Sequence, residues 1–461
     1  MSLSRLPNVT SPLTRAKANA LLGAIRRPGN IGMRLGPCGF MSDFALDAVG
    51  TGSSAGTTWD VKIALATQFD AIRLVFAQSN TNGGIANFAA STAAGSTVQV
   101  KAFAVSDLTA GAAAGTAGYP TFGGAAVGAL TIPNETQFAA TRRKSFLISD
   151  ILPISSVPRS DGGSGSILNA RLWVQGPGTN GAGTISCMGA AGAQAGVYGN
   201  LNAVWNARPD GRVWQCRKQS GDKREVGLGG GAAGGLTTQC PLIGVIFYSR
   251  QQVVNVVGLG DSIYEGLATI GQGFIHPACV NLSTSALAVE FSNLAWQGAT
   301  AAEIMAMLKD AMGAPFPIDL LAFPSFTWNG TGGASSPITA AQIDACRQMS
   351  AIGQGMARSA GIPVITTTGV PINVSIKNVG SSDILRRAYN DEIRVRGTAG
   401  TLYVADADIV VSDGVTSGQA QFPAAMTFDQ AHPSDAGNAL IAAKEQAALS
   451  ALLPAVTGGL Y

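Results

Sequence analysis

The pattern of apolar residues changes near residue 249, and this change limits the fold more than any other feature of the 461-residue chain. From residue 43 to 248, short β-like runs are separated by turn-rich stretches such as 79–84 and 161–165. After residue 249, continuous apolar runs alternate with stretches of helical periodicity. Short strands without helical periodicity are typical of antiparallel sandwiches, whereas alternating strands and helices are typical of doubly wound sheets. We therefore expect two units of different fold class.

The first unit, residues 43–248, is predicted to be an antiparallel β-sandwich with a jelly-roll-like arrangement. Residues 217–239 are rich in glycine and charge, which indicates a long loop. The predicted strands are Trp59–Leu65, Ala71–Ala77, Val98–Val105, Ala126–Ile132, Ser145–Ile151 and Ala170–Val174.

The second unit, residues 249–461, is predicted to be a doubly wound α/β layer with a parallel sheet. Val253–Leu259 is an apolar run interrupted only by Asn255, as expected for a parallel strand that is buried on both faces. Ligands of such sheets bind beyond the carboxyl ends of the strands. The other predicted strands are Leu320–Phe326, Ile362–Thr367 and Leu402–Ala405, and the predicted helices are Ala301–Met312, Ala340–Ala360, Ser382–Val395 and Ser434–Leu452.

Residues 1–42 form a basic N-terminal arm that carries no acid. Ser11-Pro12 is typical of a helix start, and Pro28-Gly29 would end the helix. Such a short helix is marginal alone in water, so it needs a surface on which to dock. That surface is either the chain's own β-domain or a neighbouring subunit of a homo-oligomer or larger assembly; disorder is the third alternative. The six basic residues are Arg5, Arg15, Lys17, Arg26, Arg27 and Arg34.

Charge and hydropathy exclude several classes of partner. Charged residues make up 12% of the chain, about half the usual ~25%, and the net charge is +3 without a dense basic stripe. Nucleic acid is therefore not an expected partner. No run of 18 apolar residues occurs, so no membrane-spanning helix is expected. The first residues lack the apolar segment of a signal peptide, which predicts cytoplasmic synthesis, with virion association or export by another route left open.

The six cysteines lie far apart and form no CxxC pair. Metal ligation by them is not expected, and we interpret them as buried, reduced thiols. A disulfide between Cys216 and Cys240, across the glycine-rich segment, is the one pairing to consider.

Ser262 lies in the segment Gly258–Ile263, which reads Gly-Leu-Gly-Asp-Ser-Ile and follows the first buried strand. At this junction its hydroxyl would be held at the strand tip, and its own N–H would face a developing oxyanion. A phosphate-binding turn or an ordinary tight turn explains the tripeptide Gly-Asp-Ser equally well.

A second segment, Phe428–Pro433, supplies a histidine with a carboxylate three residues before it. In a loop, this spacing lets Asp429 hold one ring nitrogen of His432 while the other ring nitrogen faces a nucleophile. Alternatively, Asp429 is a surface acid and His432 a helix-entry residue. The other histidine, His276, has no acid nearby and is interpreted as structural. The rival acids, which lack a short link to a histidine, are Asp406, Asp408 and Asp413.

Four segments together resemble the blocks of the SGNH (GDSL-type) serine hydrolases, in the family's order and over most of residues 250–450. The second block supplies Gly298, and the third supplies Asn329. The third block usually reads Gly-x-Asn-Asp, whereas this chain has Thr-Trp-Asn-Gly, and an Asn-Gly turn is the alternative explanation. The matching segments are Gly260–Ile263, Asn293–Thr300, Thr327–Gly330 and Asp429–His432, followed by Pro433 and Gly437.

The resemblance implies the SGNH-hydrolase fold for residues 249–461 and an ester-hydrolysing triad of Ser262, His432 and Asp429. The backbone amides of Ser262 and Gly298 and the side-chain amide of Asn329 would form the oxyanion hole. No metal or other cofactor is implied. The β-rich unit is also similar to the domain that precedes the hydrolase domain in many bacterial members, through Ala71–Val75, Val98–Ser106, Thr121–Gly124, the run to Ile132, and Phe146–Ile154.

Three functions follow as hypotheses. The first is an esterase for small acyl esters, with acetyl groups on a polysaccharide as candidate substrate; Trp59, Trp173, Trp205 and Trp214 are either sugar-stacking or core residues. The second is a lipase or thioesterase of the same mechanism. The third is a virion or surface-assembly protein, such as a phage tail or capsid component, with an auxiliary or silent hydrolase domain.

Overall fold

The computed structural model describes most of the two predicted units and none of residues 1–28. The predicted arm helix therefore lies outside the described residues, as do Trp205 and Cys240. The described residues are 29–35, 45–49, 56–79, 97–107, 117–131, 144–159, 162–175, 183–187, 214–224, 235–236, 241–266, 273–295, 298–313, 316–330, 338–373, 381–400, 402–414 and 419–457.

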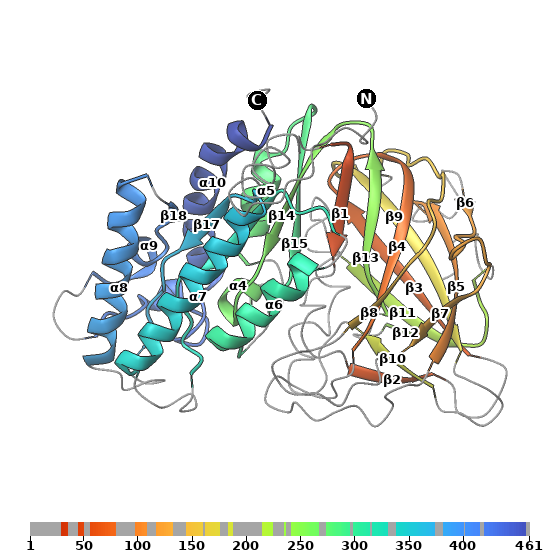
Figure 1. The fold of residues 1–461 in the computed structure, drawn as a ribbon. Coiled ribbons are helices and arrows are strands. Elements are labelled where there is room, and N and C mark those ends of the chain that lie inside the picture. The colour runs from red at the N-terminus through yellow and green to blue at the C-terminus, as the bar shows by residue number, and fades with distance from the viewer. Residues whose placement is uncertain are drawn as a thin grey trace, which may run out of the picture.

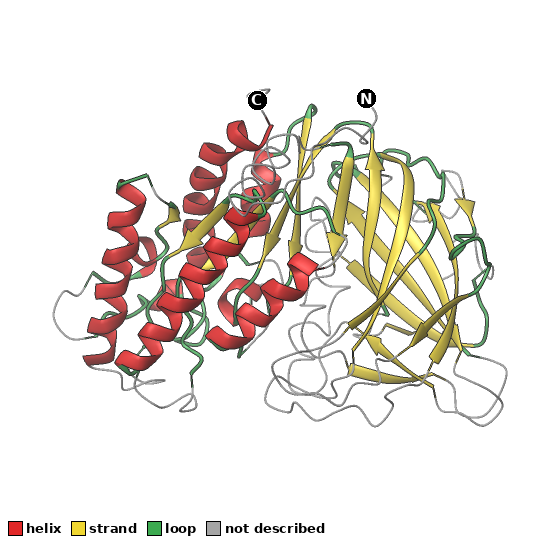
Figure 2. Ribbon diagram, in the orientation of Figure 1, coloured by secondary structure: helices red, strands yellow, loops and turns green. Residues whose placement is uncertain are grey.

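The first unit is built from antiparallel sheets (Figures 1 and 2). A four-stranded sheet has the order β1 (Ile31–Leu35), β13 (Leu242–Ser249), β4 (Phe69–Ser79) and β8 (Lys144–Ile148). A seven-stranded sheet has the order β12 (Gly235–Leu236), β11 (Trp214–Ser220), β3 (Thr57–Leu65), β9 (Ser166–Gln175), β5 (Thr97–Ser106) and β6 (Ala117–Gly118), with β7 (Gly128–Thr131) also pairing with β5. A further pair joins β2 (Ala45–Val49) and β10 (Gly183–Cys187).

Apolar side chains of the two larger sheets share one core. Phe76 and Phe247 of the four-stranded sheet are buried in the same cluster as Trp59 and Leu172 of the seven-stranded sheet. This supports two packed antiparallel layers, while the jelly-roll connections stay a prediction because several links between strands lie outside the described residues.

The second unit is a five-stranded parallel sheet, in the order β15 (Leu287–Asn293), β14 (Gln252–Gly258), β16 (Leu320–Pro324), β17 (Val364–Thr367) and β18 (Tyr403–Ala405). The chain runs from β14 outward to β15 and then returns to β16 on the other side. The carboxyl ends of β14 and β16 therefore lie at the topological switch point, where such sheets bind ligands.

Helices cover both faces of this sheet (Figure 2). Alternate residues of β14 belong to two different clusters: Val253 and Val257 share one with residues of α6 and α7, and Val254 and Val256 share the other with residues of α5 and α10. The parallel sheet is thus doubly wound, as predicted. The helices are α4 (Ser262–Glu265), α5 (Ile275–Leu282), α6 (Ala301–Gly313), α7 (Ala340–Ser359), α8 (Ser381–Thr398), α9 (Asp408–Val411), the 3₁₀ turn η2 (Ala424–Met426) and α10 (Asp435–Thr457).

Among the described helices, α10 alone is long and apolar enough to span a membrane by length and composition. It packs against α5 and the sheet, and Ile441, Leu449 and Leu453 are fully buried in that cluster. Burial of this face accounts for part of its apolar composition.

Two boundaries differ from the sequence-based expectation. Ile31–Leu35, expected in the N-terminal arm, forms strand β1 because β13 offers it an antiparallel partner over its whole length. Residues 217–220, expected at the start of a long loop, continue β11 and pair with β3. Neither segment has a local signal for its state, because the hydrogen-bonding partner is distant in sequence.

The two units meet along β1 and β15, and the contact is polar and buried. Arg34 of β1 forms an ion pair with Glu290 of β15 at 3.2 Å, and it also donates to the Phe291 carbonyl. The other carboxylate oxygen of Glu290 accepts a 2.8 Å hydrogen bond from the Ala66 backbone amide. The Leu35 amide donates to the Ser292 hydroxyl at 3.0 Å. These contacts hold β15 against the β-rich unit.

Several side-chain expectations can be compared with the structure. Trp59 and Trp173 are 0% and 5% exposed, so they are core residues rather than sugar platforms. Cys216, Cys279 and Cys346 are buried, as predicted. The suggested Cys216–Cys240 disulfide stays a prediction, because Cys240 is not described.

Candidate active site

The nucleophile candidate Ser262 is the first residue of α4, directly after the carboxyl end of β14. Asp261 caps this short helix, because its carboxylate accepts a 3.0 Å hydrogen bond from the Ile263 amide. At Gly260 a Cβ atom would lie 2.5 Å from the Tyr264 ring, so the turn requires glycine there. The Gly-Asp-Ser sequence is therefore explained by the geometry of the turn that presents Ser262.

Asp429 and His432 lie in a tight loop before α10. The loop is closed by the bridge between Thr427 and Pro433 and by a 3.0 Å hydrogen bond from the Phe428 amide to the His432 carbonyl. One carboxylate oxygen of Asp429 accepts hydrogen bonds from the backbone amides of Ala431 and His432, at 3.0 and 2.8 Å. The spacing of three residues thus fixes the carboxylate beside its own histidine.

The three side chains form a continuous chain of hydrogen bonds. The second carboxylate oxygen of Asp429 lies 2.7 Å from Nδ1 of His432, and Nε2 of His432 lies 2.9 Å from Oγ of Ser262. Burial would raise the pKa of Asp429, but its contacts with His432 and the loop amides outweigh burial and leave the pKa below its usual value. The carboxylate is therefore ionised at neutral pH and able to stabilise a protonated imidazole.

The competing residues have other contacts. His276 is buried on α5, and its ring lies against Phe291, 6.4 Å between ring centroids. Asp406 and Asp408 both accept hydrogen bonds from Arg394. The Asp413 carboxylate accepts a 3.2 Å hydrogen bond from the Gln421 amide. The residue that joins Ser262 to an acid is His432.

Gly298 and Asn329 come from the loops after β15 and β16. Gly298 has φ +78°, a left-handed conformation that favours glycine. The side-chain amide of Asn329 donates a 3.3 Å hydrogen bond to the carbonyl of Ala299, the residue after Gly298. The structure thus brings Asn329 beside the Gly298 loop.

A network around Thr327 was not found from the sequence. The Thr327 hydroxyl lies 2.7 Å from the carboxylate of Asp261 and 3.0 Å from the Ala299 carbonyl. It also accepts a 3.2 Å hydrogen bond from the backbone amide of Asn329. Thr327 and Asp261 are 66 residues apart, so no local pattern indicates their contact.

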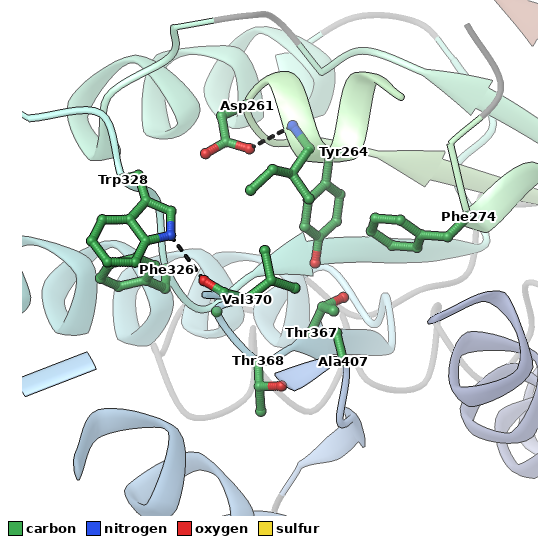
Figure 3. Close-up of a pocket in the computed structure, with 11 residues that line it drawn as sticks. Asp261, Tyr264, Phe274, Phe326, Trp328, Thr367, Thr368, Val370 and Ala407 are labelled. Carbon is green, nitrogen blue, oxygen red and sulfur yellow. Dashed lines mark hydrogen bonds between the residues drawn. The ribbon is translucent and has the colours of Figure 1, made fainter. Parts of the chain in front are cut away.

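A small recess lies beside the nucleophile turn, beyond the carboxyl ends of β16 and β17 (Figure 3). Its volume is about 320 Å³ with the solvent at its mouth included. The Trp328 indole is held by a 2.9 Å hydrogen bond from Nε1 to the Val370 carbonyl, and Figure 3 shows the Tyr264 hydroxyl directed toward Thr367. The lining residues are Asp261, Ile263, Tyr264, Phe274, Phe326, Trp328, Thr367, Thr368, Gly369, Val370 and Ala407.

Within the described part of the chain, no group of three or more His, Cys, Asp or Glu side chains is arranged to hold a metal ion.

Comparison with known proteins found matches among solved structures only. No family model matches the chain, and no curated protein matches it. Similar solved structures include G-D-S-L lipolytic proteins and an acetylxylan esterase. A lipolytic protein of the G-D-S-L family from Veillonella parvula is 18% identical, with 41% of this chain and 95% of that chain covered and a TM-score of 0.32.

Two further solved structures match with similar identity, coverage and TM-score. A GDSL-like lipase from Bacteroides thetaiotaomicron is 19% identical, with 43% of this chain and 89% of that chain covered and a TM-score of 0.32. An acetylxylan esterase from Geobacillus stearothermophilus is 15% identical, with 42% and 94% covered and a TM-score of 0.33. At such low similarity, the function of this chain has to be inferred from its own residues.

Proposed function

We propose that this chain is a serine esterase with Ser262 as nucleophile, His432 as general base and Asp429 as the orienting acid. The observation that carries the proposal is the unbroken hydrogen-bond chain from Asp429 through His432 to Ser262, with distances of 2.7 and 2.9 Å. A nucleophile and a base within hydrogen-bond reach, with the base oriented by a third group, is the arrangement that activates a serine hydroxyl.

The reaction begins when Ser262 Oγ attacks the ester carbonyl while His432 Nε2 accepts the hydroxyl proton. Asp429 holds the Nδ1 proton and stabilises the imidazolium that results. His432 then gives its proton to the leaving alcohol, and an acyl-serine forms. A water molecule, deprotonated by His432, attacks this intermediate, and the returning proton regenerates the Ser262 hydroxyl and releases the acid.

The backbone amides of Ser262 and Gly298 and the side chain of Asn329 are the proposed donors to the tetrahedral oxyanion. The side-chain amide of Asn329 has two protons, and one of them is donated to the Ala299 carbonyl. That hydrogen bond orients the amide group and leaves its second proton for the oxyanion.

The substrate we propose is an ester with a short acyl group, with acetyl as the first choice. The enclosed part of the recess beside the nucleophile turn is only about 10 Å³, roughly the room that one water molecule needs. Its walls are buried aromatic side chains such as Phe326 and Trp328, which leave little room for a long chain. A lipase or thioesterase with a long acyl pocket is less well supported by these walls.

A polysaccharide is the proposed source of the alcohol. Phe428, directly before Asp429, is 68% exposed and places an aromatic ring on the triad loop, where it is suited to pack against the apolar face of a sugar. None of the described features favours a virion or surface-assembly role, and we do not propose one.

Labelling with a fluorophosphonate probe tests the function directly. We expect one labelled peptide, containing Ser262, and loss of both labelling and p-nitrophenyl acetate hydrolysis in Ser262→Ala with unchanged thermal unfolding. p-Nitrophenyl acetate should be hydrolysed faster than the p-nitrophenyl butyrate and octanoate esters. Acetate should also be released from acetylated xylan. Labelling that persists in Ser262→Ala would disprove the assigned nucleophile.

A further inference from the structure

The Thr327 hydroxyl contacts all three segments that carry the proposed catalytic machinery. It lies 2.7 Å from the Asp261 carboxylate in the Ser262 turn, 3.0 Å from the Ala299 carbonyl in the Gly298 loop, and 3.2 Å from the Asn329 amide. Thr327 is 1% exposed, so water cannot take the place of its hydroxyl in these contacts.

The hydroxyl has one proton and can accept hydrogen bonds at its lone pairs. Its shortest contact is to Asp261, so the proton is donated there, while a lone pair accepts the Asn329 amide proton. Asp261 uses its other oxygen to cap α4 at Ile263. A single hydroxyl thus connects the helix cap beside the nucleophile to the backbone of Asn329.

Asn329 is in turn tied to the Gly298 loop, because its side-chain amide donates to Ala299. The three proposed oxyanion donors belong to separate loops after β14, β15 and β16. Loops of this kind move independently unless polar or apolar contacts connect them. Thr327 connects the Ser262 turn to the backbone of Asn329, and the Asn329 side chain completes the connection to the Gly298 loop.

The hydrogen bond from Thr327 also affects the pKa of the buried Asp261 carboxyl. Burial raises the pKa of the Asp261 carboxyl above its ordinary value, and the hydrogen bonds from Thr327 and Ile263 and the charge of His432 oppose that rise. Removing the hydroxyl would leave one carboxylate oxygen without its donor inside the protein.

We infer that Thr327 is a positioning residue that holds the Ser262 turn, the Gly298 loop and Asn329 in one geometry for oxyanion stabilisation. This inference rests on the proposed esterase function. Thr327 touches the loops and not the substrate, so its effect is expected on kcat and only weakly on KM. Displacement of a catalytic group by about 1 Å can cost roughly 10²-fold in rate, so we expect a 10- to 100-fold loss.

The test compares Thr327→Val, which keeps the shape and removes the hydroxyl, with Thr327→Ser, which keeps the hydroxyl. Both are assayed on p-nitrophenyl acetate and with the fluorophosphonate probe, well below their melting temperatures. We expect kcat and the labelling rate to fall about 10- to 100-fold in the valine variant, with KM within about 3-fold, and the serine variant to regain most of the activity.

A double-mutant cycle covers the case in which the valine variant folds poorly. Asp261→Asn removes the charged acceptor of the same hydrogen bond without changing its size. If the two residues act through that bond, the double variant will lose no more activity than the worse single variant.

The outcomes separate the two proposals. If the wild-type protein labels and hydrolyses ester but Thr327→Val does so equally fast, the positioning role is wrong and the esterase function stands. Additive losses in the cycle, or a serine variant as slow as the valine variant, also overturn the inference. If the wild-type protein neither labels nor hydrolyses, the esterase function fails, and the positioning role fails with it.

Discussion

Replacing Asp429 with asparagine tests how the triad depends on the histidine tautomer. The carboxylate oxygen 2.7 Å from Nδ1 of His432 accepts the Nδ1 proton, which leaves Nε2 unprotonated to face Ser262. The other oxygen accepts from the amides of Ala431 and His432. The asparagine oxygen will keep those two backbone hydrogen bonds, so its NH₂ group will face Nδ1.

A donor facing Nδ1 favours the tautomer in which Nε2 carries the proton, and that nitrogen cannot accept the Ser262 proton. We expect a loss of roughly 10³- to 10⁴-fold in kcat, as for other serine hydrolase triads, with the loop still folded. This corresponds to about 4–5.5 kcal/mol of transition-state stabilisation at about 1.36 kcal/mol per tenfold change. The loss should be smaller than that caused by removing the nucleophile or the base.

The assay is the steady-state hydrolysis of p-nitrophenyl acetate, with fluorophosphonate labelling as a second measure of nucleophile reactivity. Asp391→Asn is the matched control, because Asp391 is an exposed acid whose ion pair with Arg394 is on the surface of α8. A kcat for Asp429→Asn within about threefold of the control would refute the tautomer argument.

Stability against pH gives an independent check on the same carboxylate. The folded pKa of Asp429 lies below its ordinary value of 3.8, so its contacts stabilise the folded protein above that pH. This contribution is lost as the pH falls through the folded pKa. The difference in unfolding midpoint between wild type and Asp429→Asn should therefore shrink below about pH 4, and a constant difference would contradict the assignment.

The remaining predictions concern the base, the oxyanion hole and the contact between the two units. His432→Ala should cost roughly 10⁶-fold in kcat, whereas His276→Ala should change kcat little; the reverse ranking would identify His276 as the base. Asn329→Ala should lower kcat by roughly 10²-fold with a smaller change in KM, and an unchanged kcat would make Asn329 a turn residue. Arg34→Ala leaves Glu290 as a buried unpaired carboxylate and should cost about 3–5 kcal/mol in denaturant unfolding, whereas a loss below about 1 kcal/mol would contradict the buried ion pair.

The role of the N-terminal arm is tested by deletion. Deleting residues 1–35 would remove β1 and its ion pair to Glu290 along with the arm. Deletion of residues 1–28 keeps β1 and separates the arm from the sheet. If the arm docks on a neighbouring subunit, this shorter deletion should lower the mass in solution and leave ester hydrolysis unchanged, as measured by light scattering and by p-nitrophenyl acetate turnover.

The amino-acid sequence alone predicted the elements whose signals are local. The apolar run at Val253–Leu259 overlaps strand β14 over all but its last residue, and helical periodicity located α6, α7, α8 and α10. It also located the pieces of the proposed triad, because Asp429 and His432 are three residues apart and Ser262 follows a buried strand. These features depend on backbone preference and spacing, which need no distant partner.

Tertiary structure decided the features that depend on distant partners. Strand β15 contains Glu290, a charge that argues against a buried strand until Arg34 of β1 neutralises it. Trp59 is a core residue because a second sheet covers it. The contact between Thr327 and Asp261 exists because parallel strands β14 and β16 end at the same edge of the sheet, although the two residues are 66 positions apart in the chain.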